Sequence, residues 1–190
     1  MDQWPLLSIL IWLPIVGAIL VLAFGRDARV ARWLSLITTL ATLIASLPLY
    51  LNYDAVAGGM QFIESHAWIN ALKANYALGV DGIAVALIVL TTFTSVLVII
   101  GSWGPIQKRV SQYMAAMLVL EGMLIGIFCA TDALLFYVFF EAMLIPMFII
   151  IGIWGGPRRV YATLKFFIYT FLGSIFMLIA LIYLHMKTGE

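Results

Sequence analysis

Six long runs of apolar residues divide this chain of 190 residues, and they restrict its fold more than any other feature of the sequence. The hydrocarbon core of a bilayer is about 30 Å thick, so a helix rising about 1.5 Å per residue needs about 20 apolar residues to cross it. The segments that meet this requirement lie near residues 4–24, 30–51, 82–103, 112–130, 133–153 and 160–185. The sequence therefore predicts an all-α, polytopic membrane protein with a single transmembrane domain over residues 1–190.

The composition favours the same class and excludes several functions. The chain is 65% hydrophobic and 10% charged, whereas a soluble domain has about 45–50% apolar and about 25% charged residues. No sizeable polar segment is present, which excludes an enzyme of the soluble type, and a net charge of +1 offers no basic surface for nucleic acid. Cys129 is the only cysteine, so the chain has neither an internal disulfide nor a thiolate cluster for a metal.

Basic residues between the apolar segments predict the orientation in the membrane. Seven of them lie in three short connections: Arg26, Arg29, Arg32, Lys108, Arg109, Arg158 and Arg159. The opposite connections hold only Lys73 and Lys187. Because short loops rich in Lys and Arg stay on the cytoplasmic side, both ends of the chain are predicted on the external side. The first segment follows an acid instead of a basic region, so we expect it to remain as a helix and not to be cleaved as a signal.

The one long connection, residues 52–80, is predicted to be external. Apolar residues such as Phe62 and Trp68 alternate loosely with polar ones there, which favours a short β-hairpin on the membrane surface. Asp81 and Asp132 directly precede the third and fifth apolar segments. Each is predicted to cap its helix by accepting hydrogen bonds from free backbone amides.

Three ionisable residues lie inside the apolar segments, namely Glu121, Glu141 and Lys165. A charge at the centre of the bilayer costs about 2.5–3.5 kcal/mol on insertion scales, so such residues persist mainly where they line a polar path or have a partner. Each of the three is therefore a candidate functional residue. Lys165 has two open alternatives, because its side chain could extend back to the cytoplasmic surface or pair inward.

The two glutamates are predicted at the same depth. Glu121 lies ten residues before Thr131 and Glu141 ten residues after it, which puts both about 15 Å from the external surface. On antiparallel neighbours they could share one polar pocket and titrate as a pair, although the spacing does not fix whether they face each other. Burial disfavours the ionised carboxylate and a nearby cation favours it, so a buried glutamate can exchange a proton near neutral pH. The alternative is a permanently protonated glutamate in an interhelical hydrogen bond.

Residues around the two glutamates favour their placement inside the protein. Gly122 and Gly126 form a pattern of small residues that lets another helix approach closely beside Glu121. Tyr137 lies four residues before Glu141, on the same helix face, where its hydroxyl could reach the carboxyl group. Pro146 has no amide hydrogen, so it is predicted to kink the fifth helix and to leave a backbone carbonyl free for water.

The segment "LEGMLIGIFCATDALLFYVFFEAMLIPMFIIIGIWGG" resembles the large antiporter-like membrane subunits of respiratory complex I. "YALGVDGIAV" and "YATLKFFIYTFLGSIFMLIALIY" are similar to the same family, and the resemblance covers essentially the whole chain. The wider family includes subunits of multisubunit sodium/proton antiporters and of membrane-bound hydrogenases. The resemblance implies that Glu141 is the essential glutamate of helix five, which works with a lysine on helix seven. It also implies that Glu121 and Lys165 match ionisable residues of helices four and six.

The resemblance further implies an inverted-repeat subunit of about fourteen helices, of which this chain supplies the first part. We therefore expect a truncated gene product or a fragment. The implied function is proton translocation in an NADH:quinone oxidoreductase of the bacterial inner membrane, with both termini periplasmic. The chain itself would perform no redox chemistry, because NADH, FMN, iron–sulfur clusters and quinone would bind partner subunits, among them antiporter-like neighbours. A subunit of a sodium/proton antiporter or hydrogenase and a purely structural scaffold are the alternatives.

Overall fold

A computed structural model describes residues 5–56, 58–69 and 74–188 of the chain. Within these ranges it contains six helices: α1 (Leu6–Phe24), α2 (Ala28–Leu51), α3 (Gly82–Gly101), α4 (Val110–Cys129), α5 (Ala133–Trp154) and α6 (Arg159–Thr188). Each helix is long and apolar enough to cross a membrane. The predicted class of polytopic helical membrane protein is therefore confirmed, and the ends of the helices differ from the predicted ends by at most three residues.

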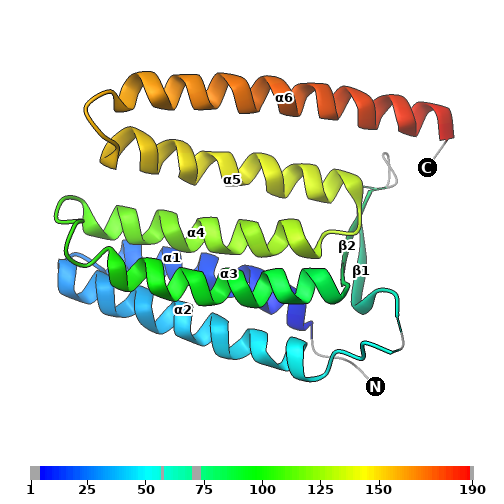
Figure 1. The fold of residues 1–190 in the computed structure, drawn as a ribbon, viewed down its shortest axis with the longest axis horizontal. Coiled ribbons are helices and arrows are strands. Elements are labelled where there is room, and N and C mark those ends of the chain that lie inside the picture. Colours follow the sequence, from blue (N-terminus) through cyan, green and yellow to red (C-terminus); the bar gives the residue numbers. More distant parts are fainter. Residues whose placement is uncertain (1–4, 57, 70–73, 189–190) are drawn as a thin grey trace.

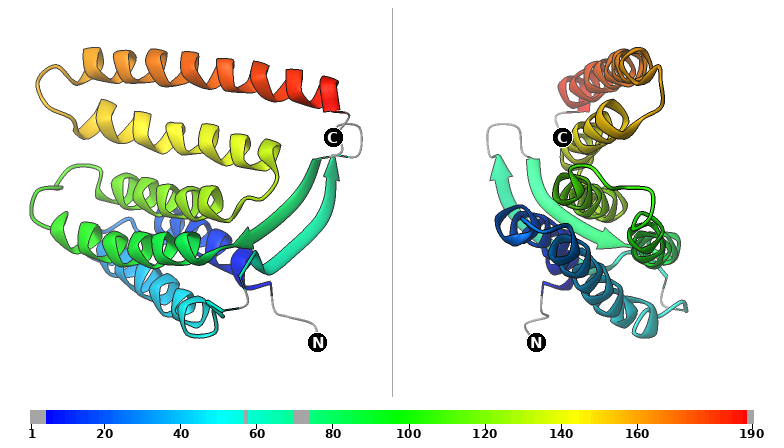
Figure 2. Two further views of the ribbon diagram at one scale, coloured as in Figure 1. Left: turned by 45° about the vertical axis from the view of Figure 1, so that its right-hand side comes forward. Right: turned by 90° about the vertical axis from the view of Figure 1, so that its left-hand side faces the viewer.

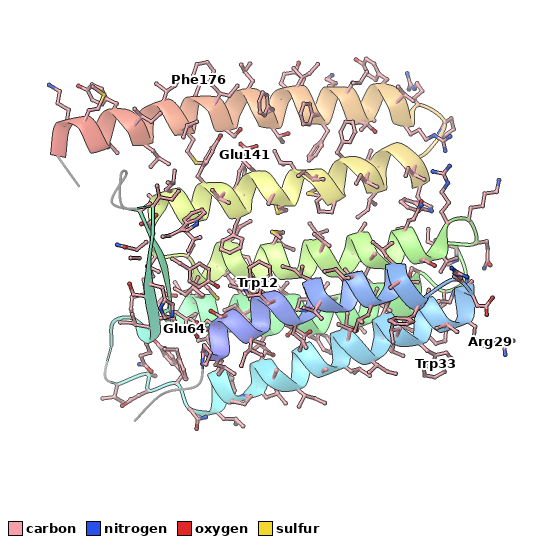
Figure 3. The ribbon with its side chains drawn as sticks, turned by 180° about the vertical axis from the view of Figure 1, so that it is seen from behind. Trp12, Arg29, Trp33, Glu64, Glu141 and Phe176 are labelled. Atoms are coloured by element: carbon pink, nitrogen blue, oxygen red, sulfur yellow. The ribbon has the colours of Figure 1, made fainter. Side chains whose placement is uncertain are left out.

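The helices lie side by side with their axes roughly aligned (Figure 1). α1, α2, α3 and α4 pack together as a bundle, α5 packs against α4, and α6 packs against α5. Figure 2 shows that α5 and α6 extend from one side of this bundle. The outer face of α6 is left open, as Phe176 illustrates with 64% exposure (Figure 3). An apolar face of this kind is suited to lipid or to another membrane helix.

A β-hairpin lies across one end of the helices (Figure 2). It consists of β1 (Gln61–Ile69) and β2 (Ala74–Val80), which pair antiparallel with His66 opposite Tyr76. The prediction of a hairpin in the long connection is confirmed by this pairing. Its position at the membrane surface stays a prediction.

The hairpin is bound to the turn between α4 and α5. The Thr131 amide donates to the Ala77 carbonyl over 3.0 Å, and the Asn75 amide donates to Asp132 Oδ2 over 3.0 Å. Asp132 Oδ1 also accepts from the amides of Leu134 and Leu135, at 2.9 and 3.0 Å. The predicted cap of α5 is thus confirmed, and the same carboxylate anchors the hairpin.

The cap of α3 also follows the prediction. Asp81 has an extended backbone, and its Oδ1 accepts from the Ala84 amide over 2.7 Å. Both aspartates therefore satisfy amides that the first turn of a helix leaves without a partner. Two charged residues at the boundaries of apolar segments are accounted for by helix capping.

The connections that carry the basic residues lie at the end of the molecule opposite the hairpin (Figure 1). They are joined by hydrogen bonds: Arg32 Nη2 donates to the Ile106 carbonyl over 2.9 Å, and Trp154 Nε1 donates to the Lys108 carbonyl over 2.8 Å. Arg29 lies at the same end (Figure 3). The separation of basic loops from the hairpin agrees with the charge asymmetry in the sequence. Which end faces the cytoplasm stays a prediction.

Two clusters of buried apolar side chains fill the core of the α1–α4 bundle. One gathers beneath the hairpin around Leu10, Ile88 and Ile125, and the other lies toward the basic loops around Val21, Met114 and Leu118. Since Leu118 and Ile125 lie one turn on either side of Glu121 along α4, the two clusters meet at the level of this glutamate. The core is therefore interrupted by a polar layer at its middle.

Candidate functional site

Glu121 is buried at the centre of the bundle with 1% of its surface exposed. Neither carboxyl oxygen has a hydrogen-bond partner among the described residues. The side chain lines a cavity of 270 Å³ between α2, α3 and α4. A polar group buried without a partner costs about 1–3 kcal/mol, so the position of this carboxyl group is costly for the bundle.

Hydroxyl groups from two other helices line the same cavity. Thr39 comes from α2, and Thr91, Thr94 and Ser95 come from α3. Apolar residues complete the walls, among them Leu90, Val98 and Leu124. The residues around this partly open cavity therefore include one glutamate and four hydroxyl residues, and its surface is largely apolar.

The two glycines beside Glu121 allow close packing of two different helices. A methyl group added at Gly122 would lie 2.7 Å from the Ile11 carbonyl oxygen on α1. One added at Gly126 would lie 2.7 Å from the Phe139 ring on α5. The predicted role of these glycines in close helix approach is confirmed, and it fixes the rotation of α4 relative to both neighbours.

Glu141 lies at the middle of α5, on the side that faces α6 (Figure 3). Its side chain is half-buried, and its Oε1 is buried without a hydrogen-bond partner among the described residues. The Tyr137 side chain lies near both Glu141 and Ser174, a buried residue of α6. One helical turn separates Tyr137 from Glu141, so both residues lie on the same face of α5.

The two glutamates do not share a pocket. Glu121 points toward α2 and α3, whereas Glu141 lies between α5 and α6. The spacing left open whether the two carboxyl groups face each other, and the structure places them apart, with Gly126 of α4 packed against Phe139 of α5. The structure has two separate carboxyl sites.

Pro146 is buried within α5, and the helix continues from Ala133 to Trp154 through it. Because proline lacks an amide hydrogen, the carbonyl of Ala142 receives no intrahelical hydrogen bond from position 146. This acceptor lies one residue after Glu141 in the sequence. The predicted kink at this position stays a prediction.

Lys165 lies on the outer face of α6 and is exposed. Its Nζ is 5.8 Å from the ring centroids of both Tyr161 and Tyr169. Nine residues separate Lys165 from Ser174, which corresponds to a half turn about the helix axis, so the lysine points away from α5. Of the two alternatives for Lys165, this geometry favours the exposed face of α6 over pairing toward α5.

Sequence reasoning overlooked the hydroxyl residues. Ser35, Thr39, Thr42 and Ser46 form a buried stripe along α2 at spacings of four, three and four residues. Ser46 Oγ lies 3.1 Å from Thr92 Oγ1 on α3. The spacing of these hydroxyl residues is that of one face of a helix, so the sequence alone could have indicated the stripe. Ser174 gave no such signal, because only the packing of α6 on α5 brings it to Tyr137.

Glu64 was also overlooked. It lies on β1, yet its carboxylate accepts hydrogen bonds from the Leu7 amide over 2.8 Å and from the Ser8 amide over 3.2 Å, at the start of α1. Ser8 Oγ also donates to Glu64 Oε2 and lies 3.1 Å from the Tyr76 hydroxyl. A helix capped by a residue more than fifty positions away cannot be recognised from local sequence.

Comparison with known proteins extends the resemblance. A sequence profile described as "NADH:quinone oxidoreductase/Mrp antiporter, TM" matches residues 130–190, which include α5 and α6. NADH-quinone oxidoreductase subunit M of Rhodobacter capsulatus is 48% identical over 189 residues, covering 97% of this chain and 36% of that protein. NADH-ubiquinone oxidoreductase chain 4 of Arabidopsis thaliana is 41% identical and covers 96% of this chain. The chain is thus similar over nearly its whole length to membrane subunits of this kind.

Chains in two solved membrane complexes have the same fold. A chain of the archaeal membrane-bound sulfane sulfur reductase superposes with a TM-score of 0.78 over 97% of this chain, at 19% identity. A chain of the Mrp complex from Dietzia sp. gives a TM-score of 0.77 at 18% identity. The present chain spans only 36–39% of the length of the subunit M relatives that it matches. The resemblance predicted from the sequence is confirmed, with the similarity lying in the first portion of subunit M.

Proposed function

We propose that this chain forms part of a proton-translocating membrane subunit of an NADH:quinone oxidoreductase. The similarity to subunit M over 97% of the chain supports this proposal. We place it in the bacterial inner membrane with the hairpin end, and so both termini, on the periplasmic side, because the basic loops lie at the other end. Its partners would be other membrane subunits, including antiporter-like neighbours, and the surrounding lipid.

The observation that carries the proposal is the environment of Glu141. One carboxyl oxygen of Glu141 is buried without a partner among the described residues near the middle of a transmembrane helix, and Tyr137 lies near it. A charge brought close to a carboxyl group in a membrane changes the balance between its protonated and ionised forms. Glu141 is therefore suited to bind a proton when its surroundings are neutral and to release it when a cation approaches.

The neighbouring residues have supporting roles in this scheme. Tyr137 would donate a hydrogen bond to the ionised carboxylate, and Ser174 would hold the tyrosine in place from α6. Pro146 leaves the Ala142 carbonyl as an acceptor for a water molecule beside the carboxyl group. Lys165 would act from the outer face of α6, so its partner would lie on the side of α6 that faces away from α5. Glu121 would form a second protonation site within the α1–α4 bundle.

The driving force would come from other subunits. NADH oxidation and quinone reduction, together with FMN and the iron–sulfur clusters, are assigned to partner chains, and charge movement in neighbouring membrane subunits would change the protonation of Glu141. This chain would contribute proton transfer and no electron transfer. Its part in the enzyme is that of a membrane subunit without a redox group.

Replacement of Glu141 by Gln in the assembled complex tests the proposal. Glutamine keeps the size and a hydrogen-bonding amide but cannot exchange a proton, so we expect NADH-driven acidification of vesicles to be lost. Glu141→Asp, which retains the acid, should restore part of it. Electron transfer from NADH to an artificial acceptor serves as the control for assembly. Unchanged proton pumping in Glu141→Gln would leave a structural scaffold as the better explanation.

The antiporter alternative predicts a different result in the same vesicles. Sodium-dependent proton flux in the absence of NADH would favour it. The identity of 48% with a subunit of an NADH-quinone oxidoreductase supports the redox-driven complex instead.

A further inference from the structure

The three short connections at the end of the molecule opposite the hairpin form one surface. Ser111 Oγ, near the start of α4, donates a hydrogen bond to the Gly25 carbonyl in the turn between α1 and α2. Arg32, near the start of α2, donates to the Ile106 carbonyl in the connection between α3 and α4. Trp154, the last residue of α5, donates to the same connection. These hydrogen bonds hold the three connections side by side.

This surface carries positive charge that the chain itself does not neutralise. Five of its basic side chains are exposed and have neither a hydrogen bond nor an ion pair within the part of the chain that the structure describes: Arg26, Arg29, Lys108, Arg109 and Arg158. Asp27 is the one acidic residue in the sequence of the three connections. Cations that lack carboxylate partners attract an anion from outside the chain, and salt screens this attraction only beyond about 10 Å at 0.1 M.

Exposed aromatic side chains lie next to these charges. Phe24, the last residue of α1, is 69% exposed, and Trp33 of α2 is 52% exposed. Trp33 follows Arg29 by one helical turn, so it lies on the same face of α2 and about 6 Å further along the helix axis. Both side chains lie at this end of the molecule (Figure 3). An indole directly below a guanidinium group suits the boundary between lipid headgroups and hydrocarbon.

The same face of α2 continues as an exposed apolar stripe. Ile37, Leu40 and Ile44 follow Trp33 at spacings of four, three and four residues, with exposures of 60, 39 and 66%. The surface therefore has two parts in series, namely basic groups at the end of the helices and an apolar face that runs from them along α2. A soluble anion would use the first part only, whereas a phospholipid would use both.

We propose that Arg26, Arg29 and Trp33 form a binding site for an anionic phospholipid, with the phosphate at the two arginines and an acyl chain along the exposed stripe of α2. Arginine suits a phosphate because its planar group can donate two parallel hydrogen bonds to the oxygens. A zwitterionic phospholipid offers the same phosphate together with a cation, which the neighbouring Lys108 and Arg109 would repel. The inference concerns the lipid environment of the chain and goes beyond the proposed function in proton translocation.

The simpler explanation is that these basic residues only direct insertion of the chain and afterwards remain in water. Orientation in the membrane depends on the number of Lys and Arg residues in short loops. It requires neither hydrogen bonds between the connections nor an exposed aromatic residue one turn below an arginine. These two features favour a lipid site, and a binding measurement separates the two explanations.

Photolabelling of the assembled complex in detergent tests the proposal. The probe is phosphatidylglycerol with a diazirine in one acyl chain, and mass spectrometry identifies the labelled peptides of this chain. We expect label in the α2 peptide that contains Ile37 and Leu40. Unlabelled phosphatidylglycerol should displace it at a much lower concentration than the zwitterionic phosphatidylcholine does.

Substitution of the arginines should weaken the labelling. In Arg29→Gln we expect the probe concentration for half-maximal labelling to rise about fivefold, and with Arg26→Gln added about 25-fold, which is the contribution expected of one and of two basic residues near anionic headgroups. Arg29→Lys, which retains the charge, should keep most of the binding. Lys187→Gln is the matched control, because Lys187 is also exposed but lies near the end of α6 at the hairpin side of the molecule, and it should leave the labelling unchanged.

Four results would overturn the proposal. Equal displacement by the two phospholipids would show that the headgroup charge is not recognised, and unchanged labelling in the double variant would show that the arginines only direct insertion. Displacement by glycerol 3-phosphate at the same concentration as phosphatidylglycerol would indicate a site for a soluble anion. Absence of label from the α2 peptide would show that this face does not contact the lipid. The measurement needs no turnover, so its outcome is independent of the pumping test on Glu141.

Discussion

The hydrogen bonds that Leu7 and Ser8, at the start of α1, donate to the Glu64 carboxylate lead to a prediction that does not depend on the function. Glu64→Ala removes the acceptor for two backbone amides and one hydroxyl. Loss of a helix cap costs about 0.5–2 kcal/mol, and a carboxylate at a helix N-terminus adds about 0.3–1 kcal/mol in favourable interaction with the helix dipole. We therefore expect destabilisation of about 2 kcal/mol, concentrated where β1 meets α1.

The effect should be local before it is global. Amide hydrogen exchange followed by mass spectrometry in detergent or nanodiscs reports opening of the first turn of α1. A loss of about 2 kcal/mol corresponds to about 30-fold faster exchange in the peptide that contains Leu7 and Ser8. The peptide from the middle of α6, which does not contact the hairpin, serves as the internal reference. Tyr76 should also lose protection, because it lies 3.1 Å from the Ser8 hydroxyl.

Glu64→Gln separates the two contributions. Glutamine keeps one acceptor oxygen for the Leu7 amide but has no charge, so we expect an intermediate effect of about 1 kcal/mol. If both variants exchange as slowly as the unmodified chain at α1, the carboxylate does not hold the hairpin to this helix, and the reasoning fails.

Three further predictions use the same structure. Gly122→Ala should destabilise the protein by about 1–2 kcal/mol in an unfolding titration, because its methyl group would meet the Ile11 carbonyl oxygen at 2.7 Å. Gly173→Ala is the control, because open space surrounds Gly173 and the change should be neutral or stabilising by up to about 1 kcal/mol. Equal effects of the two substitutions would contradict the close contact of α1 and α4. Asp132→Ala should lower the free energy of unfolding by about 1–2 kcal/mol and speed amide hydrogen exchange at both Leu134 and Asn75. Faster exchange at Leu134 alone would show that Asp132 does not anchor the hairpin. Trp154→Phe should lower stability by about 1 kcal/mol through loss of the hydrogen bond to the Lys108 carbonyl, with Trp33→Phe, whose side chain is about half exposed, as the control.

The candidate site was only partly predictable. Tyr137 and Glu141 lie four residues apart in one helix, and a helix fixes that geometry by itself. Whether Ser174 approaches from α6 depends on the packing of a second helix, and the sequence of α5 contains no information on it. The hydroxyl stripe of α2 could have been found from its spacing, but the cavity beside Thr39 exists only because this residue meets residues of α3 and α4 there.

Local sequence determined the six spans, the hairpin and the two aspartate caps, because each depends on residues close together along the chain. It also determined the common depth of Glu121 and Glu141, since the rise per residue of a helix is constant. The direction in which each carboxyl group points was decided by tertiary structure alone. A transmembrane helix can rotate about its axis without changing its depth, and the contacts of Gly122 with α1 and of Gly126 with α5 select one rotation of α4. That choice turns Glu121 toward α2 and α3 and leaves Glu141 to a separate site beside α6.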